Sequence, residues 1–489
     1  MIKFKKLPIN TIEDYNQLID IVDETHIDKK IVSILKEKIG TKCAVILIEY
    51  PYYEKDYLST YYTFYAKQHQ NHSKACFRIH FLGELDAKSK QREYYGYVSL
   101  REGVNDSKLG KTYLSPKLIL PSDEEAYLML DDYSASIFGH KVYVKAFPWM
   151  RQETDVSVCA HVAMWSILRY FGNRYKAYRD TVMGEIVENV QKEKERKIPS
   201  RGLTPNQIVE TLDLYNFSPV LLGDEFHKLH YFINEIIAYI ESGIPVVATM
   251  NRKRHAVTLF GHGKVDYDRL DNNIDLLKEP NTNIIMHSSL IKSVYAIDDN
   301  HFSYRQIDPY LPVSDKDIDY ALCEINYLIV PYCHKVLLGY NEIYEKFMEI
   351  VIKGVMEWEG TQICRIYLTS SNSFKEKAMQ NDLMNQDLKK YICLMDMPRF
   401  IWCIDLATIN ESKNGLMSGR LIADSTMGTQ DENPWLLMHN TRLLNHIEDE
   451  GKMRQIKCDI APYRIYRNNL QNKDLIGLEK TSVWEELYD

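Results

Sequence analysis

Residues 152–172 read QETDVSVCAHVAMWSILRYFG and carry the strongest structural signal in the chain. A polar approach leads to Cys159, and an apolar run that is predicted to be a helix follows it directly and ends near Gly172-Asn173. The cysteine therefore starts the helix, where free backbone N–H groups and the helix dipole favour a thiolate. A thiolate is the form that attacks carbonyl carbons in covalent catalysis, whereas the alternative is a buried cysteine that packs as a small apolar side chain.

Three further residues have side chains that would complete such chemistry. Gln152 precedes the helix, and its side-chain amide is suited to donate to a developing oxyanion. His255 begins a predicted strand that follows the strand 244–250 across a short turn, so we expect the imidazole at a sheet edge. Asp298 ends the predicted strand 293–298, where its carboxylate would hold one imidazole nitrogen and fix the tautomer.

Read in this order, these residues resemble the papain-like cysteine peptidases. More narrowly, they resemble the branch related to the bacterial double-glycine leader peptidases, which process bacteriocins. Four segments carry the resemblance: QETDVSVCAHVAMWSILRYFG (152–172), RGLTPNQIVETL (201–212), YIESGIPVVATM (239–250) and RHAVTLFGHG (254–263). The resemblance extends over residues 146–332, a little over a third of the chain.

The resemblance implies an α+β fold in which a helix that carries the nucleophile packs on an antiparallel sheet. It also implies a cysteine peptidase that cleaves a protein or peptide substrate through a thioester, without a cofactor or a metal. Cys159 would be the nucleophile, His255 the base, Asp298 the residue that orients the base, and Gln152 an oxyanion donor. The alternatives are a papain-like deamidase, transglutaminase or acyltransferase, and an inactive papain-like interaction scaffold.

The sequence departs from the family pattern at several places. Ala160 follows the cysteine where the family commonly has Gly, and nothing in the chain resembles a transporter, so the family's export role is not carried over. The family's acidic residue usually lies closer to the histidine than Asp298 does, because residues 264–292 intervene here as an insertion. Asp299 and Asp308 therefore remain alternative third members of the triad.

Other polar residues are better explained by structure than by chemistry. His161 points elsewhere on the helix than Cys159, and His262 would share the face of His255 only in a different strand register. Asp424 follows a predicted strand and fits a turn. The adjacent pair Cys333-His334 has the ligand types of a metal site, but no second pair lies at ligand spacing.

Composition limits the remaining possibilities. The 489 residues carry a formal net charge of -8, which gives no general electrostatic reason to bind nucleic acid or an anionic membrane. No stretch approaches the ~20 apolar residues of a membrane-spanning helix, and the charged N-terminus lacks the apolar core of a signal peptide. The 9 cysteines are odd in number and form no CxxC pair, so we expect a reducing cytoplasm.

The chain divides into three predicted domains. Residues 1–145 form a Tyr-rich α/β domain of unknown role, with strand-like runs at 43–49, 60–66, 75–82, 93–100 and 142–147. Residues 146–332 form the peptidase-like domain, and 333–489 alternate helix and strand as a second α/β domain. The flanking domains are candidate surfaces for a regulatory protein partner. The polar insertion 264–292 is expected to lie beside the active-site cleft and to control access to it.

Overall fold

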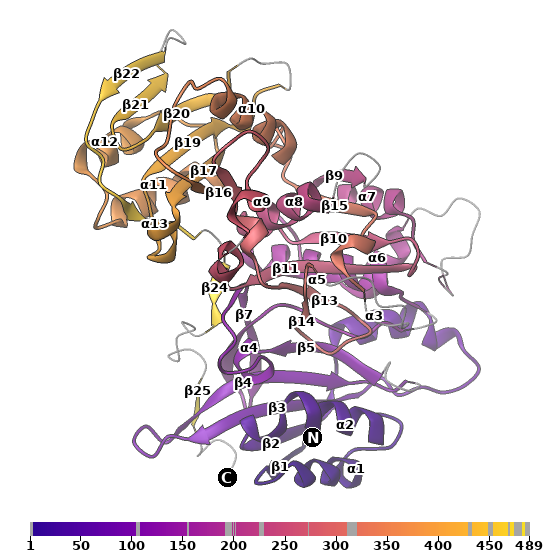
Figure 1. Cartoon of the computed structure of the whole chain (residues 1–489). Helices are drawn as coiled ribbons and strands as arrows, with labels where there is room; N and C mark the ends of the chain where they lie inside the picture. Colours follow the sequence, from indigo (N-terminus) through magenta and orange to yellow (C-terminus); the bar gives the residue numbers. More distant parts are fainter. Residues whose placement is uncertain are drawn as a thin grey trace.

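In the described part of the chain, three large sheets follow one another along the molecule, and Figure 1 shows the N-terminal sheet at the bottom, the next in the middle and the C-terminal sheet at the upper left. The structure is a computed structural model. It describes residues 3–103, 108–153, 156–190, 198, 200, 202–223, 229–271, 273–310, 320–428, 433–447, 453–467, 470–473 and 482–484. Helices combine with mainly antiparallel strands throughout, so the fold class is α+β, as predicted.

The N-terminal sheet is antiparallel and has the order β1-β2-β3-β4-β25, with β5 also paired to β4. Its strands are β1 (Lys3–Pro8), β2 (Val45–Tyr52), β3 (Cys76–Leu85), β4 (Gln91–Leu100), β5 (Leu109–Leu114) and β25 (Ser482–Trp484). The helices of this part are α1 (Gln17–Ile21), α2 (Lys29–Lys38), α3 (Lys55–Thr63) and α4 (Pro116–Ile119), and the hairpin is β7 (Asp131–Ile137) with β8 (His140–Ala146).

The predicted strand 60–66 is wrong, because most of this segment belongs to α3. Its aromatic and β-branched residues favour a strand locally, but Glu54 caps a helix by accepting hydrogen bonds from the backbone N–H groups of Asp56 and Tyr57, each at 2.9 Å. Tyr57, Thr60 and Tyr61 then fall on one buried face. The helical spacing of buried groups outweighs the local β preference.

The central sheet has the order β14-β13-β11-β10-β15-β9, and β6 pairs with both β11 and β24. Its strands are β6 (Ala126–Met129), β9 (Ser218–Gly223), β10 (Val246–Met250), β11 (His255–Gly263), β13 (Val294–Ile297), β14 (Arg305–Ile307), β15 (Tyr327–Tyr332) and β24 (Leu470–Asn472). The accompanying helices are α5 (Cys159–Arg174), α6 (Met183–Asn189), α7 (Pro205–Leu214) and α8 (Leu229–Glu241). The helix α5 packs against β11, where the Thr258 hydroxyl donates to the Ala163 carbonyl at 3.0 Å.

The C-terminal sheet has the order β12-β16-β17-β19-β20-β21-β22. Its strands are β12 (Ile284–Met286), β16 (Gln362–Ser370), β17 (Phe400–Thr408), β19 (Gly419–Asp424), β20 (Trp435–His439), β21 (Leu443–Ile447) and β22 (Met453–Lys457). Beside them lie α9 (Ile274–Leu277), α10 (Tyr340–Ile352), α11 (Ser371–Gln380), α12 (Gln386–Leu394), α13 (Ile409–Lys413) and the pair β18 (Leu416–Met417) with β23 (Tyr463–Arg464).

The predicted α/β alternation in this region does not give a parallel sheet. Two helices, α11 and α12, connect β16 to β17, and the second helix returns the chain so that the strands pair antiparallel. Asn385 separates the helices by capping α12, because its side chain accepts from the backbone N–H of Asp387 at 2.8 Å. A single helix would have carried the chain back for a parallel strand.

The insertion 264–292 does not form the predicted gate. Its strand β12 pairs in parallel with β16 of the C-terminal sheet, and the Tyr267 and Ser412 hydroxyls hydrogen-bond at 2.8 Å. Leu270 and Ile285 pack with Ile363 of β16 in one apolar cluster. None of the insertion's described residues lines the pocket that contains Cys159. The few apolar residues among its many polar ones suffice to anchor it on a neighbouring sheet.

One continuous apolar core extends from Leu7 to Leu470 and includes residues of all three sequence regions. The C-terminal tail also connects these regions, since β24 pairs with β6 and β25 pairs with β4. No helix among the described residues is long and apolar enough to cross a membrane.

Candidate active site

Cys159 lies at the first position of α5, as the sequence predicts. The helix begins there because Val158 is extended (φ -115°, ψ 173°), and the Val158 backbone N–H donates to His161 Nδ1 at 3.2 Å. His161 is thus a buried residue that caps the helix start. The Cys159 side chain is partly exposed, whereas most of the following helix is buried. The thiol is therefore accessible from solvent and lies in the positive electrostatic field of a helix N-terminus.

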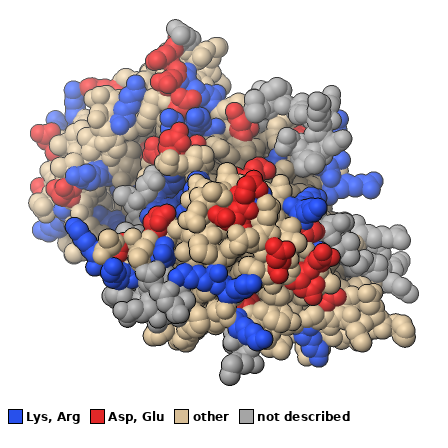
Figure 2. Space-filling view, turned by 90° about the horizontal axis from the view of Figure 1, so that it is seen from below, with Lys and Arg blue, Asp and Glu red and all other residues tan. Residues whose placement is uncertain are grey.

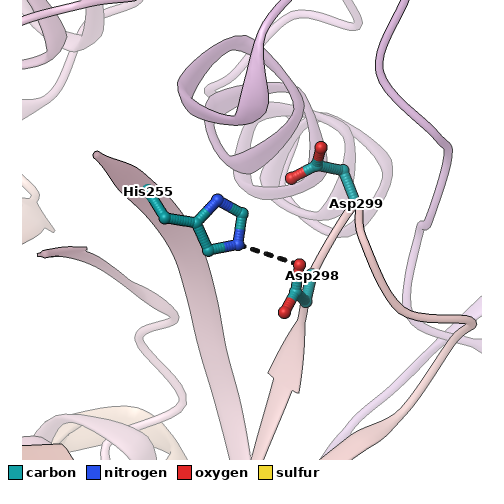
Figure 3. A group of neighbouring side chains, drawn as sticks. All are labelled: His255, Asp298 and Asp299. Atoms are coloured by element: carbon teal, nitrogen blue, oxygen red, sulfur yellow. Dashed lines mark hydrogen bonds and ion pairs between the residues drawn. The ribbon is translucent and has the colours of Figure 1, made fainter. Parts of the chain in front are cut away.

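His255 reaches the same place from the sheet. It begins β11 directly after the turn 251–254 that joins β10 to β11, and Arg254 in this turn has a left-handed backbone (φ 48°). His255 Nε2 hydrogen-bonds to Asp298 Oδ1 at 2.9 Å, as Figure 3 shows. Cys159 also acts on the ring as a hydrogen-bonding and charged neighbour. Burial lowers the pKa of His255, but the hydrogen bonds with Asp298 and Cys159 outweigh burial and raise it to about 10.

Asp298 is held by several groups that the sequence does not reveal. Its side chain is buried and its Oδ1 also accepts from the Asn300 backbone N–H at 2.9 Å. Its Oδ2 accepts from the Tyr320 hydroxyl and from Arg305 Nη1, both at 3.1 Å. Burial raises the pKa of Asp298, yet the hydrogen bond and the charge of His255 bring it down to about 2. The carboxylate therefore stays ionised beside the imidazolium.

The two alternative carboxylates occupy different environments. Asp308 is exposed and accepts from the Tyr310 backbone N–H at 2.8 Å, so it belongs to a turn. Asp299 is 1% exposed, and neither carboxyl oxygen has a hydrogen-bond partner. Figure 3 shows it beside the His255–Asp298 pair without a bond to the ring. Burial raises the pKa of Asp299 to about 6.

Among the described residues, His255, Asp298 and Asp299 form the one group with ligand atoms close enough to hold a metal ion, within 4.8 Å of one another. Nε2 and Oδ1 of this group already hydrogen-bond to each other, which is the geometry of an acid–base pair. Cys333 and His334 are not part of such a group. Two further single residues lie in structural contacts: His262 hydrogen-bonds to Glu241 at 3.1 Å, and Asp424 accepts from the Thr426 backbone N–H at 2.7 Å in the turn expected for it.

One open pocket of about 490 Å³ joins Cys159, His255 and Gln152. Three cations and no carboxylate line it; the lining residues are Arg151, Gln152, Val158, Cys159, Ser200, Gly202, Lys253, Arg254, His255, Asn300 and Tyr320. The four residues predicted from the sequence thus meet at one place, with Asp298 buried behind His255.

Gln152 is positioned from the N-terminal region. Arg101, just after β4, donates through Nη2 to the Arg151 carbonyl at 2.8 Å and forms an ion pair with the Glu153 carboxylate. Both ion-pair partners are buried. One guanidinium therefore fixes the backbone on either side of Gln152, which a flexible lysine would do less well.

Residues 144–274 match the model of the Peptidase_C39 like family, which relates this segment to the papain-like C39 cysteine peptidases. The match includes Gln152, Cys159 and His255, whereas Asp298 lies beyond it. No curated protein and no solved structure matched the chain.

The buried Asp299 gives a prediction for stability. Its folded-state pKa of about 6 exceeds its ordinary value of 3.8, so ionisation destabilises the fold increasingly between these pH values and fully above the upper one. At about 1.4 kcal/mol per pKa unit, the cost at neutral pH is on the order of 3 kcal/mol. Asp299→Asn should therefore unfold at a higher urea concentration than the wild type at neutral pH.

The advantage of Asp299→Asn should shrink as the pH falls below the folded-state pKa, because the wild-type carboxyl is then neutral as well. The exposed Asp308→Asn is the control and should show no such pH dependence. Equal or lower stability of Asp299→Asn at neutral pH would contradict the burial of an unpartnered carboxylate.

Proposed function

We propose that the protein is a cysteine peptidase that hydrolyses peptide bonds in a protein or peptide substrate. This proposal rests on one observation: Cys159 and His255 line the same pocket, and His255 Nε2 hydrogen-bonds to the buried Asp298. These groups come from a helix start, a strand start and a strand end that are far apart in the sequence. The relationship of residues 144–274 to C39 peptidases supports the same chemistry.

In the proposed reaction, the Cys159 thiolate attacks the substrate carbonyl carbon while the His255 imidazolium stands beside it. The Gln152 amide and the Cys159 backbone N–H donate to the oxyanion of the tetrahedral intermediate. His255 then gives its Nδ1 proton to the leaving amine, and the C–N bond breaks to leave a thioester. Neutral His255 takes a proton from water, whose oxygen attacks the thioester and releases the acid and the thiolate. Asp298 keeps the ring oriented throughout.

Other papain-like functions remain distinguishable by their products. A deamidase would release ammonia from a side-chain amide, while a transglutaminase or acyltransferase would pass the acyl group to an amine or alcohol instead of water. An inactive scaffold does not require Cys159 and His255 to line one pocket, and their meeting there favours an enzyme. We therefore propose peptidase activity ahead of these alternative functions.

The expected cellular setting is the cytoplasm. All 9 cysteines are free, which agrees with a reducing compartment. We further propose that the flanking regions offer a surface for a regulatory protein partner, since Arg101 of the N-terminal region already holds the loop of Gln152. Binding there would act on the oxyanion donor.

The first test replaces the two reacting groups. Cys159→Ala and His255→Ala should each abolish hydrolysis of a fluorogenic peptide library, with losses in kcat of at least about 10³-fold. Cys159→Ala should keep a thermal midpoint close to that of the wild type, whereas His255→Ala removes a hydrogen-bond partner of the buried Asp298 and should lower the midpoint. Cys333→Ala is the matched control and should retain full activity. Activity retained in either active-site variant would refute the assignment.

A second test concerns Arg101 as a positioning residue. Arg101→Lys keeps the charge but not the guanidinium that holds both sides of Gln152, so kcat should fall by about tenfold with KM little changed. Gln152→Ala should cost about 10²–10³ in kcat. If Arg101 acts through Gln152, the double variant should be no slower than Gln152→Ala alone. Fully additive losses would show that Arg101 supports the fold instead.

The charge of the pocket predicts a preference among substrates. Among the described lining residues, Arg151, Lys253 and Arg254 are basic and none is acidic, while Glu324 lies 4.0 Å from Lys253 outside the lining. Peptides with Asp or Glu next to the scissile bond should therefore be favoured. Arg254→Glu should lower kcat/KM for an acidic peptide by about tenfold and leave a neutral peptide nearly unaffected. Arg252→Glu, in the same turn but outside the pocket lining, is the control. The same loss for both peptides would contradict charge selection.

A further inference from the structure

A second pocket, of about 590 Å³, lies away from the candidate active site and shares no lining residue with it. The N-terminal sheet, the β7–β8 hairpin and the last turns of α5 surround it. Its walls are formed by Tyr52, Arg78, Tyr97, Lys111, Tyr113, Tyr133, Ser134, Ala135, Ser136, Gly139, Lys141, Arg169, Gly172, Asn173 and Asp180. Its volume is that of sites for small organic ligands.

The pocket presents cations to its interior. Arg78, Lys111, Lys141 and Arg169 line it, while Asp180 is the one acidic residue in the lining. The carboxylates that neutralise the buried cations stand behind them. Arg78 pairs with Glu49 at 2.6 Å, Lys111 with Glu54 at 2.6 Å, and Arg169 with Asp56 at 2.8 Å. None of these three carboxylates lines the pocket, but Asp180, which does, pairs with Arg169 at 2.8 Å. The interior therefore faces the positive side of the Arg78 and Lys111 pairs, and Arg169 is neutralised within the lining.

Two polar atoms in the wall have no partner among the residues that the structure describes. The Tyr133 hydroxyl and Arg169 Nε are both buried without a hydrogen bond. Tyr133 is 4% exposed and Arg169 is 7% exposed, so neither residue is compensated by bulk solvent. An unpaired buried donor costs about 1–3 kcal/mol, and a ligand acceptor in the pocket would remove that cost.

Aromatic rings complete the wall. The rings of Tyr113 and Tyr133 stack with centroids 4.1 Å apart, and the Arg78 guanidinium lies over the Tyr52 ring at 4.2 Å. Tyr97 lies edge-on to Tyr113 at 5.6 Å. These contacts cover one face of Tyr52, Tyr113 and Tyr133, so each ring has at most its other face and its edge for a flat ligand ring. The cations suit an anionic group attached to that ligand ring.

We propose that this pocket binds a small aromatic anion, in which an aromatic or heteroaromatic ring carries a phosphate or a carboxylate. The anionic group lies among Arg78, Lys111 and Arg169, and accepts from the Tyr133 hydroxyl and Arg169 Nε. The ring rests against the tyrosine side chains. This binding does not depend on peptidase activity, so the two proposals succeed or fail separately.

Calorimetric titration of the full chain tests the proposal, with ATP as the phosphate-bearing probe and phenylpyruvate as the carboxylate-bearing probe. Binding of either probe at micromolar to millimolar concentration is expected, and the tighter one identifies the anionic group. Tripolyphosphate, which has the charge but no ring, should bind more weakly than ATP. Absence of binding by both aromatic probes at millimolar concentration would overturn the proposal.

Tyr133→Phe is the decisive variant because it removes a hydroxyl that has no partner among the described residues. The thermal midpoint of this variant should be unchanged or raised, whereas its affinity for the probe should fall by about tenfold. Lys141→Glu at the exposed rim should weaken the probe as well, whereas Lys88→Glu, on the exposed loop between β3 and β4, should not. Unchanged affinity in both pocket variants would show that the probe binds elsewhere and would overturn the proposal.

Discussion

The hydrogen bond between His255 and Asp298 depends on how β11 and β13 pair, and the candidate site depends on that bond. Thr258 lies opposite Ile297 in the antiparallel register. This register brings Asp298, the residue after β13, close to His255, the first residue of β11. The insertion between the strands has to leave this register intact. It does so because its ends meet, with the Gly263 backbone N–H donating to the Ser293 carbonyl at 2.8 Å. The chain between these ends packs on another sheet instead of disturbing the pair.

Electrostatics around the pair assign different roles to adjacent carboxylates. Asp298 is satisfied by His255, Arg305 and Tyr320, and its pKa is brought down to about 2. Asp299 has the same chemistry and similar burial but no hydrogen-bond partner, and burial raises its pKa to about 6. The difference between the two pKa values arises from the neighbouring groups alone. Asp298 and Cys159 together favour the imidazolium, whereas the unpartnered second carboxyl lowers stability at neutral pH.

The local part of this site could be predicted from the sequence. Cys159 before an apolar helix and His255 at the start of a strand are local patterns, and the order of four segments resembles a known family. The sequence leaves Asp298, the adjacent Asp299 and the more distant Asp308 as candidates, and the structure separates them by strand register and burial. Local patterns could not show that residues 55–63 form a helix, because the cap at Glu54 and the tertiary burial outweigh β preference there. The roles of Arg101 and Tyr320 come from contacts between distant segments, for which no motif exists.

Thiol labelling tests the central claim, that Cys159 is the reactive nucleophile beside the His255 imidazole, most directly. The full-length protein would be treated with limiting iodoacetamide at about pH 6, where ordinary thiols react slowly, and modification at each of the 9 cysteines would be measured by mass spectrometry. The account predicts that Cys159 is alkylated first in the wild type and loses this advantage in His255→Ala. Alkylation of Cys333 or Cys458 ahead of an inert Cys159 would contradict it.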